Sequence, residues 1–286
     1  MVRCGVCFRH CDIPEGKRGF CGARVCENGE VKADNYGRIT SLALDPIEKK
    51  PLSRFHPGSR ILSVGSYGCN LRCPFCQNYE ISWSSEAMRL RDRAEVLSPE
   101  MLVRYALRAK AYGNIGIAFT YNEPLVGWEF VRDTAKLAHE RGLLCVLVTN
   151  GTADLSVLEA LGGLVDAMNI DLKGFTERYY TEVLGGCLDM VKAFIVRAVR
   201  LCHTELTTLI VPGENDSEDE MRALSGWISE LTDADGRVVG ADIPLHVSRF
   251  FPRFHMTDRP ATDKELVYRL ADVAREKLKY VYTGNC

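Results

Sequence analysis

The chain has 286 residues, of which 46% are hydrophobic and 26% are charged, and its formal net charge is -2. This length and composition are those of a globular protein with one large core or two smaller ones. The near-neutral charge gives no electrostatic basis for binding nucleic acid or an anionic membrane. No apolar stretch approaches membrane-spanning length, and the first residues do not form a signal peptide. The sequence therefore predicts a cytoplasmic protein.

Cysteines are concentrated near the start of the chain, where five of the twelve lie in the first 26 residues. In a reducing compartment, so many cysteines indicate metal or redox chemistry rather than disulfides. We expect residues 1–57 to form a small Cys-rich segment. Four of its thiols suffice for a tetrahedral zinc site or an auxiliary iron–sulfur cluster, and they are Cys4, Cys7, Cys11 and Cys21. His10 and Cys26 are alternative fourth ligands, and the identity of the metal stays open.

A second group of cysteines follows an apolar, strand-like run at 61–65. It is the loop Cys69-Asn-Leu-Arg-Cys73-Pro-Phe-Cys76. Ordinary ferredoxin clusters use four cysteines, so three thiolates on a short loop leave one iron free for a substrate or cofactor. A structural zinc site is the alternative, but zinc usually requires a second cysteine pair and none lies nearby.

From about residue 58 onward, β-branched apolar runs alternate with helical patterns. The predicted strands are 61–65, 115–120, 143–149, 165–171, 205–211, 243–248 and 279–283. Regular strand–helix alternation predicts a parallel sheet. We therefore expect an α/β fold over residues 58–286, a partial (β/α)6 TIM-like barrel with its active residues at the carboxyl ends of the strands.

Helix boundaries carry recognisable capping signals. Ser98-Pro99 predicts a helix start with Ser as N-cap, and Gly113 predicts the end of that helix. Two further starts resemble capping boxes, in which a Ser or Thr side chain and a Glu three residues later cap the same turn. They are Ser217 with Glu220, and Thr262 with Glu265.

Polar side chains follow several of the predicted strands. They are Thr120-Tyr-Asn-Glu123, Thr149-Asn150, Asn169-Ile-Asp171-Leu-Lys173 and Pro244-Leu-His246. Each signal is weak alone: Asp171 and Lys173 share one strand face, so a structural ion pair is the alternative to a binding role. Their joint occurrence at successive strand ends favours a cofactor pocket next to the cysteine loop.

These motifs resemble those of radical S-adenosylmethionine (SAM) enzymes. More closely, the chain resembles the radical SAM component of the AmmeMemoRadiSam system, itself similar to pyruvate formate-lyase-activating enzymes. The matching segments include 44–51, 68–78, 120–124, 169–173 and 246–252, together with the N-terminal cysteines. The Gly-Gly-Glu of many radical SAM enzymes is replaced here by Tyr121-Asn122-Glu123.

The resemblance implies an oxidoreductase in which a [4Fe-4S] cluster on Cys69, Cys73 and Cys76 cleaves SAM and yields a 5′-deoxyadenosyl radical. It implies an electron donor such as flavodoxin or ferredoxin. The implied substrate is a protein or peptide, with Memo-like and AMMECR-like proteins as partners. Two alternatives stay open: radical SAM modification of a small molecule, and a non-catalytic iron–sulfur or zinc protein.

The resemblance also implies roles for individual residues around SAM. Phe75 packs near the adenine, and the turn Tyr121-Asn122-Glu123 holds the amino group by backbone contacts. The ribose or carboxylate is contacted by Asn150, Asp171 and Lys173. His246 lies beside SAM.

Overall fold

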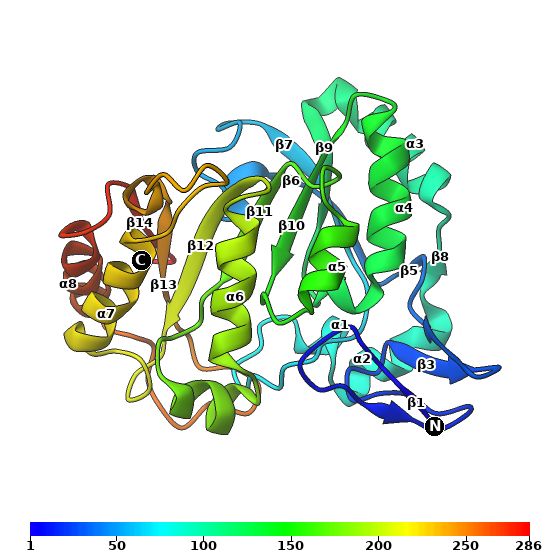
Figure 1. Ribbon diagram of the computed structural model, residues 1–286, viewed down its shortest axis with the longest axis horizontal. Helices are drawn as coiled ribbons and strands as arrows, with labels where there is room; N and C mark the ends of the chain where they lie inside the picture. The colour runs from blue at the N-terminus through cyan, green and yellow to red at the C-terminus, as the bar shows by residue number, and fades with distance from the viewer.

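The computed structural model describes residues 1–286, and its centre is an eight-stranded sheet in the order β14-β13-β12-β11-β10-β9-β7-β6 (Figure 1). Neighbouring strands from β7 to β14 pair in parallel, whereas β6 pairs antiparallel with β7. The strands are β6 (Ser41–Pro46), β7 (Arg60–Gly65), β9 (Asn114–Phe119), β10 (Leu144–Thr149), β11 (Ala167–Asp171), β12 (His203–Ile210), β13 (Leu245–Arg249) and β14 (Val281–Gly284). Because β6 and β14 are both edge strands, the barrel is open.

Six helices follow the strands and cover the sheet. They are α3 (Pro99–Ala109), α4 (Trp128–His139), α5 (Leu155–Ala160), α6 (Leu188–Ala198), α7 (Glu218–Ser229) and α8 (Lys264–Arg275). Helices α4, α5 and α6 lie over one face of the sheet, and α7 and α8 lie at the end formed by β13 and β14 (Figure 1). Strands such as β10 read as continuous apolar runs because a parallel sheet buries both of its faces. The fold is the predicted partial TIM-like barrel.

The N-terminal residues form short hairpins beside the carboxyl ends of the parallel strands (Figure 1). Their strands are β1 (Val2–Arg3), β2 (Asp12–Ile13), β3 (Arg24–Glu27), β4 (Glu30–Ala33) and β5 (Arg38–Ile39), of which β5 pairs with β8 (Glu95–Val96). Two short helices close this region, α1 (Tyr79–Ser82) and α2 (Ser85–Leu90). Val6 and Ile13 belong to the same 59-residue hydrophobic core as the barrel strands. The segment is therefore packed onto the barrel.

Single-turn elements complete the chain. The short 3-10 helices are η1 (Ile47–Lys49), η2 (Arg91–Arg93), η3 (Lys110–Tyr112), η4 (Pro124–Gly127) and η6 (Gly240–Asp242), and η5 (Tyr179–Leu184) is a π-helix. None of the helices combines the length and the apolar character that crossing a membrane would require.

The predicted N-cap residue is confirmed at two of three helices. Ser98 caps α3 by accepting from the Met101 amide, and Gly113 follows the last turn with φ of 86°. Ser217 likewise accepts from the Glu220 amide at α7. The Thr262 capping box is wrong, because Asp263 caps α8 by accepting from the amide of Glu265.

Thr262 has a different role, which explains the error. It is fully buried, and its hydroxyl donates to the carbonyl of Ile210 at 2.7 Å and accepts from the amide of Phe250 at 3.2 Å. A side chain that joins two strand ends has no free oxygen for the helix. The adjacent Asp263 is exposed and free to cap.

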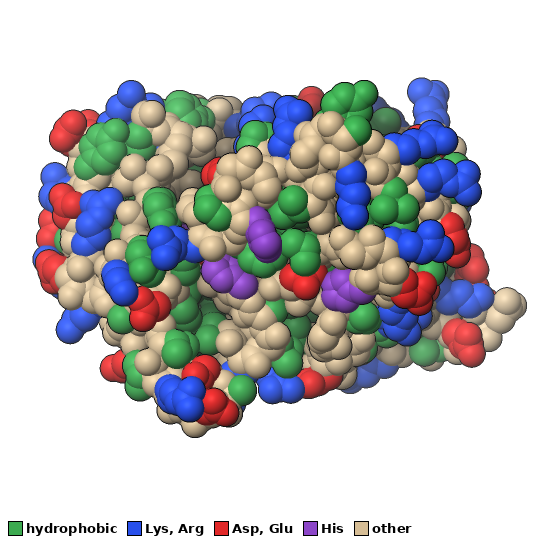
Figure 2. Space-filling model, turned by 90° about the horizontal axis from the view of Figure 1, so that it is seen from above, with side chains coloured by type: hydrophobic (Ala, Val, Ile, Leu, Met, Phe, Trp, Pro, Cys, Tyr) green, Lys and Arg blue, Asp and Glu red, His purple; other side chains and the backbone are tan.

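Figure 2 shows the face of the molecule above the amino ends of the strands, opposite the cysteine loop. Basic and acidic side chains are mixed over this face, and histidine side chains gather near its middle among hydrophobic ones (Figure 2). The ring of Phe55 lies 4.7 Å from that of His56 and 5.4 Å from that of His203. The view shows no large area of one charge, in keeping with the near-neutral composition.

Candidate functional site

The cysteine loop begins directly after β7, at the carboxyl edge of the sheet. Gly68 precedes the first cysteine with φ of 103°, a conformation that favours glycine. A Cβ at this position would lie 2.4 Å from the Cβ of Ala23 and 3.3 Å from the carbonyl oxygen of Cys21. Glycine therefore allows the N-terminal segment to approach the loop closely. The amide of Cys69 donates to that same Cys21 carbonyl at 3.2 Å.

Arg72 braces the loop from within. Its Nη1 donates to the carbonyls of Cys69 and Leu71, both at 2.7 Å, and its Nη2 donates to the carbonyl of Phe20. Its backbone amide donates to the carbonyl of Leu184 at 3.0 Å. These bonds fix the backbone around the first cysteine and add a cation beside the thiols.

The three loop thiols lie in a shared, largely buried environment. Burial raises the pKa of Cys69 well above its ordinary value, with further contributions from nearby Glu123, Cys73 and Cys76. Burial likewise raises the pKa of Cys73 to about 11. The thiols of Cys69 and Cys73 are therefore protonated at neutral pH, and binding a metal would displace their protons.

The donor set fits a cluster better than a single ion. Nowhere in the structure do three or more His, Cys, Asp or Glu side chains converge closely enough to hold one metal ion. In a cubane cluster each thiolate binds a different iron, so the sulfurs lie farther apart than the ligands of one zinc ion. Three thiols on one loop fit three irons of such a cluster and leave the fourth open.

Two amide side chains, Asn70 and Asn150, lie against the first cysteine. Asn150 Nδ2 lies 3.8 Å from Cys69 Sγ and donates to Asn70 Oδ1 at 2.9 Å. The Asn150 amide donates to Glu123 Oε2 at 2.8 Å, and Thr149 Oγ1 donates to Glu123 Oε1 at 2.7 Å. Burial raises the pKa of Glu123 to about 7. The ends of β9 and β10 are thus tied to the cysteine loop, as predicted from their polar residues.

The turn at residues 121–123 contacts the loop mainly through Asn122. Its Oδ1 accepts from the Ser66 amide at 3.0 Å, and its Nδ2 donates to the Gly68 carbonyl at 3.1 Å. Tyr121 adopts φ of 73°, and its hydroxyl donates to Asp45 at 2.7 Å. The Tyr121 side chain thus packs on β6 rather than on the cysteines, which leaves the backbone of the turn as the part near the loop.

Asp171 and Lys173 form the ion pair considered as their structural alternative, with Nζ and Oδ2 2.8 Å apart. Burial lowers the pKa of Lys173, but Asp171 and Cys73 outweigh it, so the net pKa is raised. The hydroxyl of Tyr180 accepts from the Lys173 amide at 3.0 Å. The hydroxyl of Tyr179 is buried without a partner, and burial, followed by nearby Cys73, raises its pKa. This edge therefore retains a cation and an unpaired hydroxyl close to Cys73.

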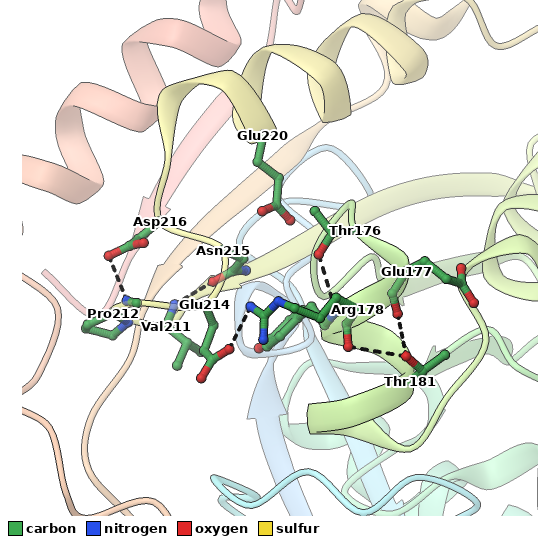
Figure 3. Close-up of polar contacts among 12 residues, drawn as sticks. Thr176, Glu177, Arg178, Thr181, Val211, Pro212, Glu214, Asn215, Asp216 and Glu220 are labelled. Carbon is green, nitrogen blue, oxygen red and sulfur yellow. Dashed lines mark hydrogen bonds and ion pairs between the residues drawn. The ribbon is translucent and has the colours of Figure 1, made fainter.

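The loop that follows β12 holds the backbone of Lys173 in place. Asn215 Nδ2 donates to the Lys173 carbonyl at 2.7 Å, and Glu220 accepts from the Phe175 amide at 2.6 Å. Figure 3 shows Glu214 and Arg178 facing one another between the two loops, at 3.0 Å. Glu220 therefore does not complete a reciprocal capping box, because its carboxylate binds the neighbouring loop instead.

Phe75 and His246 lie in different surroundings. The ring of Phe75 is buried and makes an edge contact with that of Phe250, 6.1 Å between centroids. His246 Nε2 lies 2.7 Å from Glu205 Oε2, and its ring stacks on Tyr282. The structure thus joins His246 to Glu205, near the start of β12, rather than to the cysteine loop.

The N-terminal cysteines gather beside this site. One cavity is lined by Cys4, Cys7, Cys11 and Cys21. Cys26 does not line it, and its Sγ lies 3.5 Å from Glu15 Oε2.

Sequence reasoning missed three residues that organise the site: Arg9, Asn70 and Arg72. Asn70 and Arg72 lie inside the cysteine motif, where attention to polar positions between the thiols would have found them. Arg9 Nε donates to the Asn70 carbonyl at 2.7 Å, across 61 residues of sequence. Contacts as distant as that one carry no local sequence signal.

The comparisons with known proteins agree with this geometry. A family model described as the radical SAM superfamily matches residues 63–224, from within β7 to within α7. The chain belongs to the radical SAM superfamily. Membership of this superfamily implies a [4Fe-4S] cluster and SAM as cofactors.

Individual relatives extend this superfamily match over most of the chain. It is 41% identical over 287 residues to an uncharacterised protein of Methanocaldococcus jannaschii, covering 99% of this chain and 81% of that one. It is 26% identical over 233 residues to the pyruvate formate-lyase-activating enzyme of Clostridium pasteurianum, covering 78% and 93%. The structure of Streptococcus suis SuiB bound to S-adenosylmethionine has a TM-score of 0.57 at 14% identity, over 79% of this chain and 52% of that chain. This last likeness supports the radical SAM fold.

Proposed function

We propose that this radical SAM enzyme cleaves SAM reductively at Cys69, Cys73 and Cys76 and abstracts hydrogen from a protein or peptide substrate. The observation that carries the proposal is the three-thiol loop at the carboxyl edge of an open barrel, surrounded by polar ends of β9, β10 and β11. When bound, the cluster would supply one electron that breaks the S–C5′ bond of SAM, which gives methionine and a 5′-deoxyadenosyl radical, and the radical would take a hydrogen atom from the substrate to become 5′-deoxyadenosine.

The chain's own residues have separate tasks in this proposal. Cys69, Cys73 and Cys76 hold three irons, and the buried Asn150 places an amide donor beside the first thiolate. Lys173 keeps a positive charge near the site, which suits the carboxylate of SAM. The polar turn with Glu123 offers backbone groups to the SAM amino group. Phe75 supplies an apolar surface for the adenine.

The placement of His246 beside SAM stays a prediction. In the structure, Nε2 of this histidine already contacts Glu205. Proton and hydride steps on this residue are not part of the proposal. Its test is direct, since His246→Asn would change SAM affinity only if the ring contacts SAM.

A protein or peptide substrate is favoured by the similarity to an activating enzyme that this chain spans almost completely. We further propose a cytoplasmic enzyme that receives electrons from a flavodoxin- or ferredoxin-like donor. Memo-like and AMMECR-like proteins are the proposed partners. Modification of a small molecule is the second candidate, and identifying a product labelled by deuterated SAM would decide between them.

The experiment that tests the proposal is anaerobic reconstitution with iron and sulfide, followed by reduction, addition of SAM and assay of 5′-deoxyadenosine. We expect product from the native chain and none from Cys73→Ala. Cys202→Ala is the matched control, because this cysteine lies just before β12 and away from the loop. Absence of product from the native chain with several reductants, or zinc without iron in the loop, would refute the proposal and favour a non-catalytic metal protein.

A further inference from the structure

A cavity in the N-terminal segment gathers four cysteine side chains that the proposed reaction does not use. Its thiols belong to Cys4, Cys7, Cys11 and Cys21, of which all but Cys11 are buried. The amide of Cys4 donates to the carbonyl of Cys11 at 2.8 Å, and this bond brings the two ends of the segment 4–11 together beside the cavity. A Cβ on Gly19 would lie only 3.0 Å from Cδ1 of Ile13, so glycine lets these two lining residues pack closely.

The spacing of these thiols excludes a site already formed for one ion. Around a zinc ion with Zn–S bonds of about 2.3 Å, the four sulfurs of a tetrahedral site lie within about 4 Å of each other. No three of these cysteines converge in that way, although all four face the same cavity. The same is true of the three cysteines of the superfamily loop, where a cubane cluster is implied. Neither cysteine set is therefore arranged around a single ion.

Two arginines make the cavity suitable for an anionic group. Arg9 and Arg24 both line it. Arg24 is almost completely buried, and its Nη1 donates to both carboxylate oxygens of Glu129 at 2.7 Å. Its Nε is buried and has no partner. An unpaired buried donor is costly, and a sulfide or thiolate of a cluster would accept its hydrogen bond.

We propose that Cys4, Cys7, Cys11 and Cys21 bind a second [4Fe-4S] cluster. Four protein thiolates complete the coordination of all four irons, so this cluster has no open position for SAM. The site does not depend on the proposed reaction, because it follows from the cavity, the thiols and the unpaired Nε of Arg24.

The position of the site suits electron transfer to the loop at Cys69. The Cys21 carbonyl accepts from the Cys69 amide at 3.2 Å, and Arg9 donates to the neighbouring Asn70 carbonyl at 2.7 Å. With both clusters bound, a flavodoxin- or ferredoxin-like donor would lose one electron to the second cluster, and that electron would pass on to the cluster held by Cys69, Cys73 and Cys76. No atom or proton moves in this step. This relay, unlike the site itself, rests on the proposed function.

The segment offers a matched control for the ligand assignment. Cys26 is buried, like three of the four proposed ligands, and lies in the same segment, but its thiol contacts Glu15 and is not part of the cavity. His10, the other alternative ligand, does not line the cavity either. Replacing Cys26 should leave the metal content unchanged, whereas replacing Cys7 should not.

The test is the iron, sulfide and zinc content of the full chain after anaerobic reconstitution, with EPR of the reduced protein. We expect about eight iron atoms per native chain and about four in the Cys4→Ser/Cys7→Ser double variant. Cys26→Ser should keep the native value. The Cys69→Ala/Cys73→Ala/Cys76→Ala triple variant should keep about four, with an EPR signal that SAM does not change.

The triple variant separates this proposal from the proposed function, because its first cluster is absent and its N-terminal segment is intact. A triple variant that is folded by circular dichroism but holds no iron would overturn the second cluster. One zinc ion per chain, lost in the double variant, would overturn it as well. For the relay, the double variant should lose flavodoxin-driven SAM cleavage and keep cleavage driven by dithionite. Equal loss with both reductants would contradict the relay.

Discussion

Glu205 is a fully buried carboxylate that accepts hydrogen bonds from two backbone amides and lies against two histidines. The amides of Ser53 and Arg54 donate at 3.0 and 2.7 Å, and the Nε2 atoms of His203 and His246 lie 2.9 and 2.7 Å away. Burial alone would raise the pKa of Glu205, but the two histidines and the Arg54 amide lower it to about 2. Glu205 therefore fixes the loop before β7 to strands β12 and β13.

Glu205→Gln should lower the free energy of unfolding at pH 7. The pKa falls from 4.5 to about 2 on folding, a difference worth on the order of 3 kcal/mol. Because the folded-state pKa is depressed, this contribution is present above pH 4.5 and is lost as the pH falls toward 2. Denaturant unfolding of the metal-free native and variant chains should thus show a gap that narrows below pH 4.5. A gap independent of pH would contradict this assignment.

Gly68→Ala should destabilise the protein more than Gly58→Ala. Both glycines have positive φ, 103° and 80°, so both substitutions incur backbone strain of about 1–3 kcal/mol. Only at Gly68 would the new Cβ collide, with Ala23 at 2.4 Å, because nothing lies within 4 Å of the same atom at Gly58. Thermal unfolding compares the two variants. Equal melting temperatures would show that the N-terminal segment does not approach the loop as described.

At the scale of single residues, a local motif predicts a contact between two side chains when both follow strands whose ends meet in the fold. Asn150 and Glu123 were predicted from their places after two strands, and the parallel sheet places them in contact. The bond between His246 and Glu205 spans 41 residues and was not predictable, because Glu205 lies in an ordinary strand pattern. Family resemblance predicts that His246 lies beside SAM. The structure shows that the ring also contacts Glu205.

At the scale of elements, helix α8 offers a test of which residue caps it. Asp263→Ala should cost about 1 kcal/mol of stability, the usual effect of losing an N-cap, because Asp263 accepts from the Glu265 amide at 2.7 Å. Ser217→Ala at α7 should cost a similar amount for the same reason. Denaturant unfolding measures both. If Asp263→Ala leaves the free energy of unfolding unchanged, Asp263 is not the N-cap and Thr262 is the better candidate.

Strands such as β9 and β10 were predictable because each is a largely apolar run, the pattern of a parallel sheet buried on both faces. The predicted run 143–149 corresponds to β10 and the run 205–211 to β12, within two residues at each end. The cap of α8 was mistaken because Thr262 and Asp263 are adjacent and both are good caps. Burial of Thr262 between two strand ends decides between them, and burial is a property of the whole fold.

At the scale of the molecule, the N-terminal segment and the cysteine loop occupy the same edge of the sheet. The barrel core includes residues of that segment such as Val6, and Arg24 joins it to α4 through Glu129. The predicted division at residue 57 stays a prediction, although β6 (41–46) pairs with the barrel strand β7. Sequence patterns placed the two cysteine groups in separate segments. Only the fold shows that Cys21 and Cys69 share a hydrogen bond.

The most direct test of the account is the EPR spectrum of the reduced, reconstituted chain before and after addition of SAM. If Cys69, Cys73 and Cys76 hold a cluster with one open iron, SAM should change the g-values of one signal, and Cys73→Ala should abolish that response. The Cys4→Ser/Cys7→Ser variant should retain the response. An iron–sulfur signal that SAM leaves unchanged in the native chain would contradict the central claim.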